Sequence, residues 1–441
     1  MISQDARNLK EVSTLACPSI FDELDWRELI FQVSDVEGFK KLTEAPQSVY
    51  AGFDPTADSL HIGHIVPLIA LRRFQLAGHT PIALVGGGTG LIGDPSGRTS
   101  ERTLNTLETV ETYSEKLRGQ LEKFLDFSGS VSNPAKLLNN YEWIGKMSAV
   151  EYLRDLGKFF TINWMLAKDS VKSRLDREES GLSYTEFSYM LLQAYDFQYL
   201  AEHHNCMLQI GGSDQWGNMT AGCELIRKKN AKEAYIVTFP LITTSAGVKF
   251  GKTEGGAVWL DPEKTSPYAF YQYWINVTDQ DVIRFLKYFT FLSKERIDEL
   301  EEAKKNDPDT RPAQRALAYE MTSMVHGKSA VDEVISASEA LFGKGDLSAI
   351  SLPVLESAVS AAPTLEVDSV DAIPAIDQLL ADLKVSSSKS EAKKLITSGG
   401  LYVNNNRISD IKYRPEATHL LHGRLMIIRK GKKNYYIVKV K

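Results

Sequence analysis

The chain has 441 residues, of which 43% are hydrophobic and 24% charged, a composition typical of globular proteins rather than disordered or collagen-like chains. No apolar run approaches the roughly 18 residues that a membrane-spanning helix needs. Three cysteines, Cys17, Cys206 and Cys223, are too few and too scattered for a disulfide framework or a four-ligand zinc site. The first residues lack the apolar core of a signal peptide, so we expect a cytoplasmic protein with no membrane partner.

Charge is distributed unevenly along the chain. The formal net charge is -6, but residues 375–441 contain 14 Lys and Arg against 5 Asp and Glu, whereas the other residues contain 37 against 52. A basic tail on an acidic body favours a polyanionic partner held mainly by the tail. Charge alone does not separate a nucleic-acid-binding domain from a small, solvated, lysine-rich one.

Strands and helices alternate through residue 242. Helical patterns are expected within residues 1–45, 61–78, 106–127 and 184–200, with mixed, partly helical sequence over 141–181. Apolar strand runs occupy 49–53, 81–85, 207–210 and 235–242. Pro67 fits the second helix only if it lies in the first turn, where its missing N–H has no partner to lose. This alternation predicts an α/β core with a mainly parallel sheet.

The pattern changes after this core. Residues 266–345 are helical throughout, which predicts a separate α-helical domain. Residues 346–374 are rich in Ser, Ala, Pro and Val without a regular period, so we expect a linker there. Residues 375–441 have the pattern of a small, basic, mixed α/β domain.

A possible phosphate site follows the first strand run, in the string Asp54-Pro-Thr56 and then His61-Ile-Gly63-His64. A helix begins here, and its unpaired N–H groups and partial positive charge suit a phosphate. Gly63 leaves room for close approach to the backbone, and histidines at i and i+3 lie on one face of the turn. Two surface or capping histidines remain the simpler alternative, but the strand and Asp-Pro-Thr before them make it less favoured.

Two glycine-containing loops complement this turn. Lys249-Phe-Gly-Lys252-Thr places two cations three residues apart, a clasp for a polyphosphate, although Lys-Gly loops are common. Residues 86–95 contain the spacing G-x-G-x-x-G of dinucleotide-binding turns. Pro95 disfavours the helix that such a turn requires, so we expect a wide loop carrying Asp94, Arg98 and Arg102 towards a site. A plain glycine-rich turn is the alternative.

Polar residues for a small-molecule pocket occur in two further strings. Ser183 and Glu186 have the spacing of a helix-capping box, and Tyr189, Gln193 and Asp196 then share one face of an otherwise apolar helix. That stripe either faces water or lines a pocket for a polar molecule. The string from Gly211 through Gly212, Ser213, Asp214, Gln215, Trp216 and Gly217 to Asn218 follows a strand run, where open α/β sheets bind ligands.

Taken together, these strings resemble the bacterial-type tyrosyl-tRNA synthetases, a class I aminoacyl-tRNA synthetase family. Its HIGH signature is literal at 61–64, and its KMSKS signature has a variant form at 249–253. FDPTADSLHIGH, GLIGDPSGR, TEFSYMLLQAYDF and QIGGSDQWGN are similar to the family, and SKSEAKKLITSGGLYVNNNRISD resembles a small RNA-binding module shared with a ribosomal protein. The likeness runs from about residue 20 to the end.

The resemblance implies a fold and a reaction. The fold would be a Rossmann-like, doubly wound catalytic domain over 1–260, with a dimer-interface insertion at about 125–182. A helical anticodon-side domain (261–350), a linker (351–374) and an RNA-binding domain (375–441) would follow. The enzyme would activate L-tyrosine with ATP and Mg²⁺ and transfer it to tRNA(Tyr), as a homodimer without a resident metal.

The resemblance also implies a role for each site residue. The phenol of tyrosine would contact Tyr50 and Asp196, its ammonium group Asp94, Tyr189 and Gln193, and its carboxylate Gln215. The nucleotide would be bound by Gly52, Asp54, Gly63, Gly212 and Asp214. The phosphates would be stabilised by Thr56, His61, His64, Lys249, Lys252, Arg98 and Arg102. RNA would be bound by Lys389, Lys393, Lys394 and Arg407.

Three alternatives remain. A tryptophan-specific or other HIGH-type adenylate-forming enzyme is disfavoured by Tyr50 and Asp196, which suit a phenol. An inactive RNA-binding relative is disfavoured by the intact His61, Lys249 and Lys252. A nicotinamide enzyme is disfavoured by Pro95. Two departures from the family, Ala51 where a cysteine is frequent and Pro67 where a polar residue is frequent, bear on ATP affinity rather than on the reaction type.

Overall fold

The computed structural model describes residues 15, 17–96, 104–168, 171–172, 182–245, 247, 250–253, 256–341, 345–386, 388–431 and 434–441, with Lys252 and Thr253 described by their backbone only. The chain forms two compact units, residues 1–264 with 277–325, and residues 265–276 with 326–441. Within the described ranges, no helix has both the length and the apolar character required to cross a membrane.

A six-stranded sheet forms the centre of the first unit, in the order β1-β6-β5-β2-β3-β4. Strands β2 to β6 pair in parallel and β1 pairs antiparallel to β6. The bounds are β1 Gln32–Val33, β2 Ser48–Phe53, β3 Thr80–Val85, β4 Lys136–Asn139, β5 Cys206–Gly212 and β6 Tyr235–Phe239. Because the chain proceeds outward from β2 in one direction and from β5 in the other, the strand order reverses between these two central strands.

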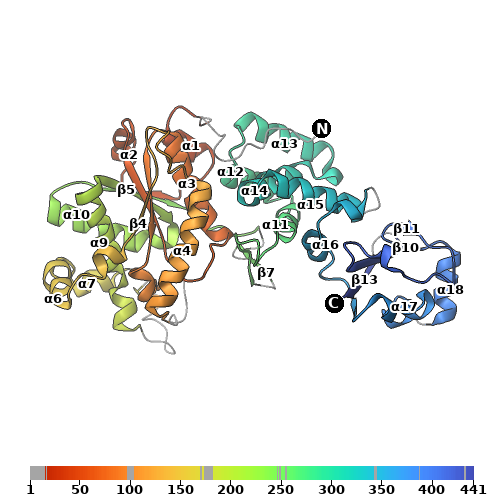
Figure 1. Cartoon of the computed structure of the whole chain (residues 1–441). Coiled ribbons are helices and arrows are strands. Elements are labelled where there is room, and N and C mark those ends of the chain that lie inside the picture. Colours follow the sequence, from red (N-terminus) through yellow and green to blue (C-terminus); the bar gives the residue numbers. More distant parts are fainter. Residues whose placement is uncertain are drawn as a thin grey trace. The chain divides into compact units, whose positions relative to one another are not determined.

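Helices cover both faces of this sheet, which explains why β2 and β3 are almost continuously apolar. Helices α3 and α4 lie on one face, and α9 and α10 on the other (Figure 1). The helices and 3₁₀ turns before residue 264 are α1 Ile20–Trp26, α2 Val36–Thr43, η1 Ile62–His64, α3 Ile65–Leu76, η2 Thr89–Leu91, α4 Leu107–Phe124, α5 Tyr141–Ile144, α6 Ala149–Glu151, η4 Gly157–Phe159, α7 Ile162–Leu166, α9 Tyr184–His204, η5 Ser213–Gln215 and α10 Trp216–Asn230, with a π-helical turn, η3, at Tyr152–Leu156.

Local sequence explains where the two central helices begin. Pro67 lies in the first turn of α3, as predicted, and most residues of α3 are buried. Helix α9 begins after Ser183, whose side chain accepts a hydrogen bond from the Glu186 backbone N–H. The chain leaves α9 through Asn205, which has a left-handed backbone conformation.

Three helices after residue 276 complete the first unit: α12 Val282–Phe289, α13 Lys294–Asn306 and most of α14 Pro312–His326, with a 3₁₀ turn, η6, at Pro308–Thr310. A two-stranded hairpin, β7 Lys252–Thr253 and β8 Gly256–Ala257, belongs to the same unit. The helical segment predicted over 261–350 is therefore divided between the two units, and the domain boundaries drawn from the sequence stay predictions.

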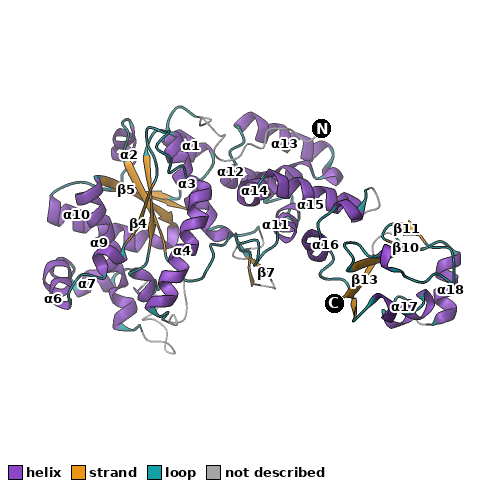
Figure 2. Ribbon diagram, in the orientation of Figure 1, coloured by secondary structure: helices purple, strands orange, loops and turns teal. Residues whose placement is uncertain are grey.

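The second unit combines helices with a small sheet (Figure 2). The sheet has five strands in the order β11-β10-β12-β13-β9. Its helices and 3₁₀ turns are α11 Pro267–Ile275, α15 Lys328–Leu341, η7 Leu347–Ala349, α16 Leu352–Ala358, η8 Val370–Ala372, α17 Ile376–Asp382, α18 Lys389–Thr397 and η9 Ala417–His419. Its strands are β9 Thr364–Val367, β10 Leu401–Val403, β11 Asn406–Arg407, β12 Leu425–Lys430 and β13 Asn434–Val440.

The segment expected to be a linker is folded instead. Residues 351–374 contain helix α16 and strand β9, and β9 pairs in parallel with β13 at the edge of the C-terminal sheet. Leu355 of α16 packs in the same apolar cluster as Leu425, Ile427 and Ile437 of the sheet. The irregular sequence of this segment reflects two short elements that bury only part of their surface, and the linker prediction is wrong here.

Candidate active site

The predicted site residues gather where β2 and β5 end, at the point where the strand order reverses. Strand β2 carries Tyr50 and Gly52 and leads directly into Asp54, while β5 ends at Gly211 and Gly212 and leads into Asp214. Open parallel sheets bind ligands outside the carboxyl ends of their strands at such a point. Gly52 is exposed, and a Cβ there would meet no atom within 4 Å, so one side of β2 is open.

The HIGH turn organises both of its histidines through backbone hydrogen bonds. His61 precedes η1, and its Nδ1 accepts from the Gly63 N–H at 3.1 Å, while His64 Nδ1 accepts from the His61 N–H at 3.2 Å. A neutral imidazole that accepts at Nδ1 carries its hydrogen on Nε2. The two rings stack at 4.0 Å between centroids, and the edge of Trp259 packs against His61 at 5.9 Å. The turn therefore presents two oriented Nε2–H donors, which suits phosphate oxygens.

The backbones of the HIGH and KMSKS segments are joined through Val258. The Val258 carbonyl accepts from the Ile62 N–H at 3.0 Å, and its N–H donates to the Gly251 carbonyl at 3.1 Å. Leu260 N–H donates to the Leu60 carbonyl at 2.8 Å, which extends the pairing. A Cβ on Gly251 would come within 2.9 Å of the Ile62 side chain, and Gly251 has a φ of +91°. Glycine therefore permits both the turn and this close approach.

Several predicted phosphate ligands fall outside what the structure describes. Arg98, Arg102 and Lys249 lie outside the described residues, and the side chain of Lys252 is not described either. The backbone of Lys252 pairs with Ala257 in the β7–β8 hairpin, next to Gly251. Thr56 is described and exposed, and its N–H donates to the Asp54 carbonyl.

Tyr50 and Asp196 form a buried polar pair. Tyr50 is 1% exposed, and its hydroxyl has no hydrogen-bond partner among the described residues. Asp196, on α9, is 3% exposed; its Oδ2 accepts from Asn140 Nδ2 at 2.8 Å and its Oδ1 from Trp143 Nε1 at 2.7 Å. The Tyr50 ring also packs against Phe197 at 5.2 Å. An unsatisfied buried hydroxyl is costly, so it marks a place where a ligand atom would be stabilising.

Burial shifts the pKa values of this pair in the same direction. Burial raises the pKa of Asp196 to about 8, even though the hydrogen bonds from Asn140 and Trp143 favour the charged form. Burial also raises the pKa of Tyr50 well above its usual value, and the nearby negative charge of Asp196 adds to the shift. The Tyr50 hydroxyl is therefore a donor at neutral pH, next to a carboxyl group that titrates near physiological pH.

A second polar cluster contains Asp94, Gln193 and Gln215, which are far apart in the sequence. Gln215 Nε2 donates to Asp94 Oδ2 at 2.7 Å, and Asn218 Nδ2 donates to Gln193 Oε1 at 3.1 Å. Asn218 Nδ2 also lies 3.4 Å from Asp94 Oδ1, and Asn218 is 2% exposed. Carboxylate and amide oxygens converge here, which is the arrangement that an ammonium group requires.

Asp54 links Tyr189 to the polar cluster around Asp196. Its Oδ2 accepts from the Tyr189 hydroxyl at 2.8 Å and its Oδ1 from Thr89 Oγ1 at 2.7 Å. Thr89 Oγ1 in turn accepts from Asn140 Nδ2 at 3.0 Å, so a continuous network runs from Tyr189 to Asp196. Burial, and then the charge of Asp54, raises the pKa of Tyr189 well above its usual value. Tyr189 therefore orients Asp54, and the ammonium contact that the resemblance implies for Tyr189 stays a prediction.

The glycine-rich segment after β3 behaves as predicted. It forms a single 3₁₀ turn at η2, not a long helix, and Gly93 has a φ of +84°. The Gly88 N–H donates to Asn140 Oδ1 at 2.7 Å, and a Cβ on Gly86 would collide with Asp54. These glycines allow the loop to pack against the polar network, and the geometry does not fit a dinucleotide-binding turn.

In the second unit, the predicted RNA-binding residues are exposed on α18 and on the neighbouring strand β11. Lys389, Lys393 and Lys394 lie on this helix, and Arg407 lies on β11. Arg407 Nη2 donates to the Ser398 carbonyl at 3.4 Å, at the C-terminus of α18. Gly399 has a φ of +73°, and a Cβ there would overlap the Arg407 guanidinium. The Gly-Gly turn therefore lets a strand cation lie beside the helix end.

Three buried side chains that organise the site were not predicted as site residues: Asn140, Trp143 and Asn218. Asn140 and Trp143 lie at the beginning of α5, far beyond Tyr50 in the sequence and in a segment without a recognisable motif. Asn218 belongs to the quoted string after β5, but nothing in that string distinguishes it from a helix-surface residue.

Comparison with known proteins agrees with this geometry. The family described as tRNA synthetases class I (W and Y) matches residues 42–343, and the tyrosine–tRNA ligase SYY-like C-terminal domain matches residues 355–438. The chain is 53% identical to tyrosine–tRNA ligase 1 of Bacillus cereus over 95% of this chain and 99% of that protein. It is also 53% identical to tyrosine–tRNA ligase of Geobacillus stearothermophilus, over 95% of this chain and 98% of that protein.

Among solved structures, a C-terminally truncated mitochondrial tyrosyl-tRNA synthetase of Aspergillus nidulans matches with a TM-score of 0.67 and 33% identity. The match covers 77% of this chain and 98% of that one. The family match over most of the chain and the bacterial relatives at 53% identity agree with the fold and with the HIGH turn. The chain belongs to the class I tRNA synthetase family that comprises the tryptophan and tyrosine enzymes.

Proposed function

We propose that this chain ligates tyrosine to tRNA, using the pocket between Tyr50 and Asp196 for the phenol and the HIGH turn for the triphosphate of ATP. Tyrosine is activated with ATP to tyrosyl-adenylate and pyrophosphate, and the tyrosyl group is then transferred to the 3′ end of tRNA.

The unpartnered, buried hydroxyl of Tyr50 beside Asp196 is the observation that carries the proposal. The hydroxyl of a tyrosine ligand can accept a hydrogen bond from Tyr50 and donate one to Asp196. This would give the Tyr50 hydroxyl its missing partner and Asp196 a third hydrogen bond. Phenylalanine would leave both buried groups without that partner. Tyrosyl-tRNA synthetases are themselves the established example of this effect, and the family as a whole rejects phenylalanine by roughly 10⁵-fold without an editing site.

Adenylate formation needs positioned charges rather than a protein nucleophile. A carboxylate oxygen of tyrosine attacks the α-phosphorus of ATP, the bond to the bridging oxygen breaks, and pyrophosphate leaves with the electron pair. The Nε2–H groups of His61 and His64 at the helix start, and Thr56 after β2, are proposed to stabilise the charge that develops on the phosphates. Lys249, Lys252, Arg98 and Arg102 are proposed to bind the departing pyrophosphate.

The remaining polar groups would hold the rest of the two substrates. Asp94, Gln193 and Tyr189 are proposed for the ammonium side of tyrosine, with Tyr189 acting through Asp54 as well. Gln215 would lie near the reacting carboxylate. Gly52, Gly63, Gly212, Asp54 and Asp214 are proposed for the nucleotide, because the exposed backbone at Gly52 and the end of β5 allow close approach.

Mg²⁺ is proposed to enter with ATP. Within the described ranges, no three His, Cys, Asp or Glu side chains are placed to hold a metal ion together. The HIGH turn offers N–H donors, which suits an ion held by the oxygens of the triphosphate rather than by a protein cage. The ion would neutralise phosphate charge, and the residues of the chain would position the phosphates.

The RNA and subunit partners complete the proposal. The phosphates of tRNA would be contacted by Lys389, Lys393, Lys394 and Arg407.

A homodimer is supported by exposed apolar side chains from α6 to the start of α9, namely Val150, Leu153, Ile162 and Tyr184, each at least 59% exposed. Free cysteines at 17, 206 and 223 agree with a cytoplasmic location. A monomeric mass in light scattering would contradict the dimer.

ATP–pyrophosphate exchange with each of the twenty amino acids tests the proposed activity. Tyrosine alone should support rapid exchange, and His61→Ala should abolish most of it while leaving tyrosine binding intact. Rapid exchange with tryptophan, or no exchange with any amino acid, would overturn the proposal.

A further inference from the structure

Helix α12 contacts the segments on both sides of the KMSKS sequence. On the N-terminal side, Asp281 at the start of α12 is 2% exposed. Its Oδ2 accepts from the Ser245 N–H at 3.0 Å, from Ser245 Oγ at 3.1 Å and from Thr278 Oγ1 at 2.9 Å. Three donors thus converge on one carboxylate oxygen, and two of them come from the segment that leads into the KMSKS sequence.

Arg284 extends this contact by one further residue of the same segment. Its Nη2 donates to Asp281 Oδ1 at 2.7 Å and to the Thr243 carbonyl at 2.8 Å. Burial alone would raise the pKa of Asp281, but the hydrogen bonds from Ser245 and Thr278 and the charge of Arg284 outweigh it and lower the pKa. Asp281 is therefore ionised at neutral pH, which strengthens each of these hydrogen bonds.

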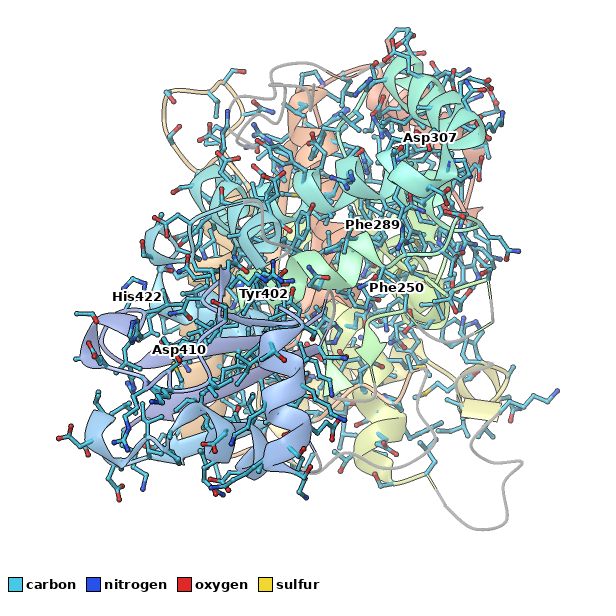
Figure 3. All side chains as sticks on the ribbon, turned by 90° about the vertical axis from the view of Figure 1, so that its right-hand side faces the viewer. Phe250, Phe289, Asp307, Tyr402, Asp410 and His422 are labelled. Atoms are coloured by element: carbon cyan, nitrogen blue, oxygen red, sulfur yellow. The ribbon has the colours of Figure 1, made fainter. Side chains whose placement is uncertain are left out.

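Within the KMSKS sequence itself, Phe250 packs on the same helix. Its ring lies 4.5 Å from that of Phe285 and 5.6 Å from that of Phe289, both on α12. Phe250 and Phe289 are labelled in Figure 3. Phe250 is 8% exposed, and its N–H donates to the Ile242 carbonyl at 2.9 Å. Thr243–Ser245 and Phe250 are thus both held against α12.

The far end of α12 is fixed to the helix that begins at the HIGH turn. Arg73 of α3 is fully buried, and its Nη2 donates to the Thr290 carbonyl at 2.8 Å. Arg27 of α1, paired with the buried Glu23, donates to the same carbonyl at 2.9 Å. Two guanidinium groups therefore bind the C-terminus of α12, where carbonyl groups lack helical partners. Helix α12 cannot shift relative to α3 without breaking these buried hydrogen bonds.

We infer that Asp281 is a positioning residue for the pyrophosphate end of the ATP site, acting through the segment Thr243–Ser245, which directly follows the hydrogen bond between Ile242 and Phe250. This inference rests on the proposed function of the HIGH and KMSKS segments. With Ser245 held by Asp281 and Phe250 held by α12, the Gly251 backbone stays beside Ile62 through Val258. Loss of the carboxylate frees one of these two attachments and leaves the tyrosine pocket untouched.

Asp281→Ala should therefore affect ATP chemistry selectively. We expect the single-turnover rate of tyrosyl-adenylate formation, and its reversal by pyrophosphate, to fall about 10- to 100-fold, because small misplacements of reacting groups have effects of that size. The Kd for tyrosine should stay within twofold, and transfer from preformed adenylate to tRNA should be unchanged. Asp281→Asn keeps an oxygen acceptor for the Ser245 N–H and should recover part of the rate.

Asp279→Ala is the matched control. Asp279 lies two residues away and is exposed; its side chain accepts from Gln314 of α14 and does not contact Thr243 or Ser245 among the described contacts. The variant removes the same charge from the same segment. It should form adenylate at close to the parental rate.

The outcomes separate this inference from the proposed function. Equal rates for Asp281→Ala and Asp279→Ala would overturn the inference, and so would an equal loss of tyrosine binding, because that would indicate a general structural role. If Asp281→Ala does not fold, the same comparison applies to Asp281→Asn. Unchanged adenylate formation in Lys249→Ala and Lys252→Ala would instead show that the proposed function of the KMSKS segment is wrong.

Discussion

Asp196 is the residue at which selectivity for tyrosine should be most sensitive. Its two oxygens already accept from Asn140 and Trp143, and the phenol would add a third hydrogen bond. Asp196→Asn replaces a carboxyl group by an amide whose N–H₂ would face one of the existing donors. Because leaving a buried polar group without a partner costs about 1–3 kcal/mol, discrimination against phenylalanine should fall roughly 5- to 150-fold. Relative kcat/KM values in pyrophosphate exchange measure this, and an unchanged ratio would contradict the assignment.

The raised pKa of Asp196 predicts that selectivity depends on pH. The carboxyl group is largely protonated below its pKa of about 8 and accepts more strongly once it is ionised above that value. The ratio of tyrosine to phenylalanine affinity should therefore rise between pH 7 and pH 9, and it should be flat in Asp196→Asn. Equilibrium binding at each pH tests this, and a flat ratio in the parental protein would argue against ionised Asp196 as the phenol acceptor.

The same shift has a consequence for stability. The folded state holds the proton of Asp196 above the ordinary carboxyl pKa, so this group stabilises the fold at low pH and that contribution is lost as pH rises through about 8.

Sequence reasoning at this scale identified candidate residues within motifs, whose roles stay predictions, and did not identify the residues that support them. Tyr50, Asp196 and His61 lie in strings whose chemistry is readable one residue at a time. Asn140 and Trp143 both donate to Asp196, and their importance depends on tertiary contacts between segments that are far apart in the chain. A single sequence contains no local signal for such a contact, because either residue would also be ordinary at the start of a surface helix.

Among the secondary-structure elements, the packing of α9 against α10 supports the phenol pocket. Gly222 of α10 faces Phe197 of α9, and a Cβ on Gly222 would come within 2.7 Å of that ring. Phe197 is fully buried and also contacts Tyr50. Gly222→Ala should therefore destabilise the protein by about 1–3 kcal/mol and weaken tyrosine binding, because overpacking displaces neighbouring side chains.

Gly119→Ala provides the comparison for that variant. Gly119 lies within α4, and a Cβ there would meet no atom within 4 Å. Alanine is the better helix former by about 0.5–1 kcal/mol, so this variant should melt at the same or a higher temperature. Thermal unfolding of both variants decides the matter; similar melting curves would mean that α10 can shift to accommodate the methyl group.

Elements with strong periodicity or long apolar runs were predictable, and short elements in mixed sequence were not. Strands β2 and β3 and helices α3 and α9 were identified because burial on both sides leaves an almost continuous apolar pattern. Strand β9 was missed because it is a short edge strand, and Thr364 and Glu366 within it are exposed. Its position depends on pairing with β13 at the far end of the chain, so its own composition resembles that of a linker.

At the scale of the whole molecule, the separation of acidic body and basic tail predicts that adenylate formation and tRNA charging can be uncoupled. Truncation before residue 375 is a poor test, because it would leave β9 without its partner β13 and would expose Leu347 and Leu355, which pack against the C-terminal sheet. Exposed charges on α18 can be removed without opening that core. Lys393 and Lys394 are both exposed, whereas Ala392 and Ile396 on the same helix are buried.

The double variant Lys393→Gln and Lys394→Gln should therefore keep its full rate of pyrophosphate exchange and its melting temperature. Its KM for tRNA should rise, and the slope of log affinity against log salt should become shallower by about 2, roughly one for each lost phosphate contact. Lys304→Gln with Lys305→Gln on α13 removes two cations, the half-buried Lys304 and the exposed Lys305, from the other compact unit and should leave the salt slope unchanged. If both double variants changed the slope equally, the tail would not be the principal phosphate-binding surface, and the charge asymmetry would reflect solubility rather than recognition of RNA.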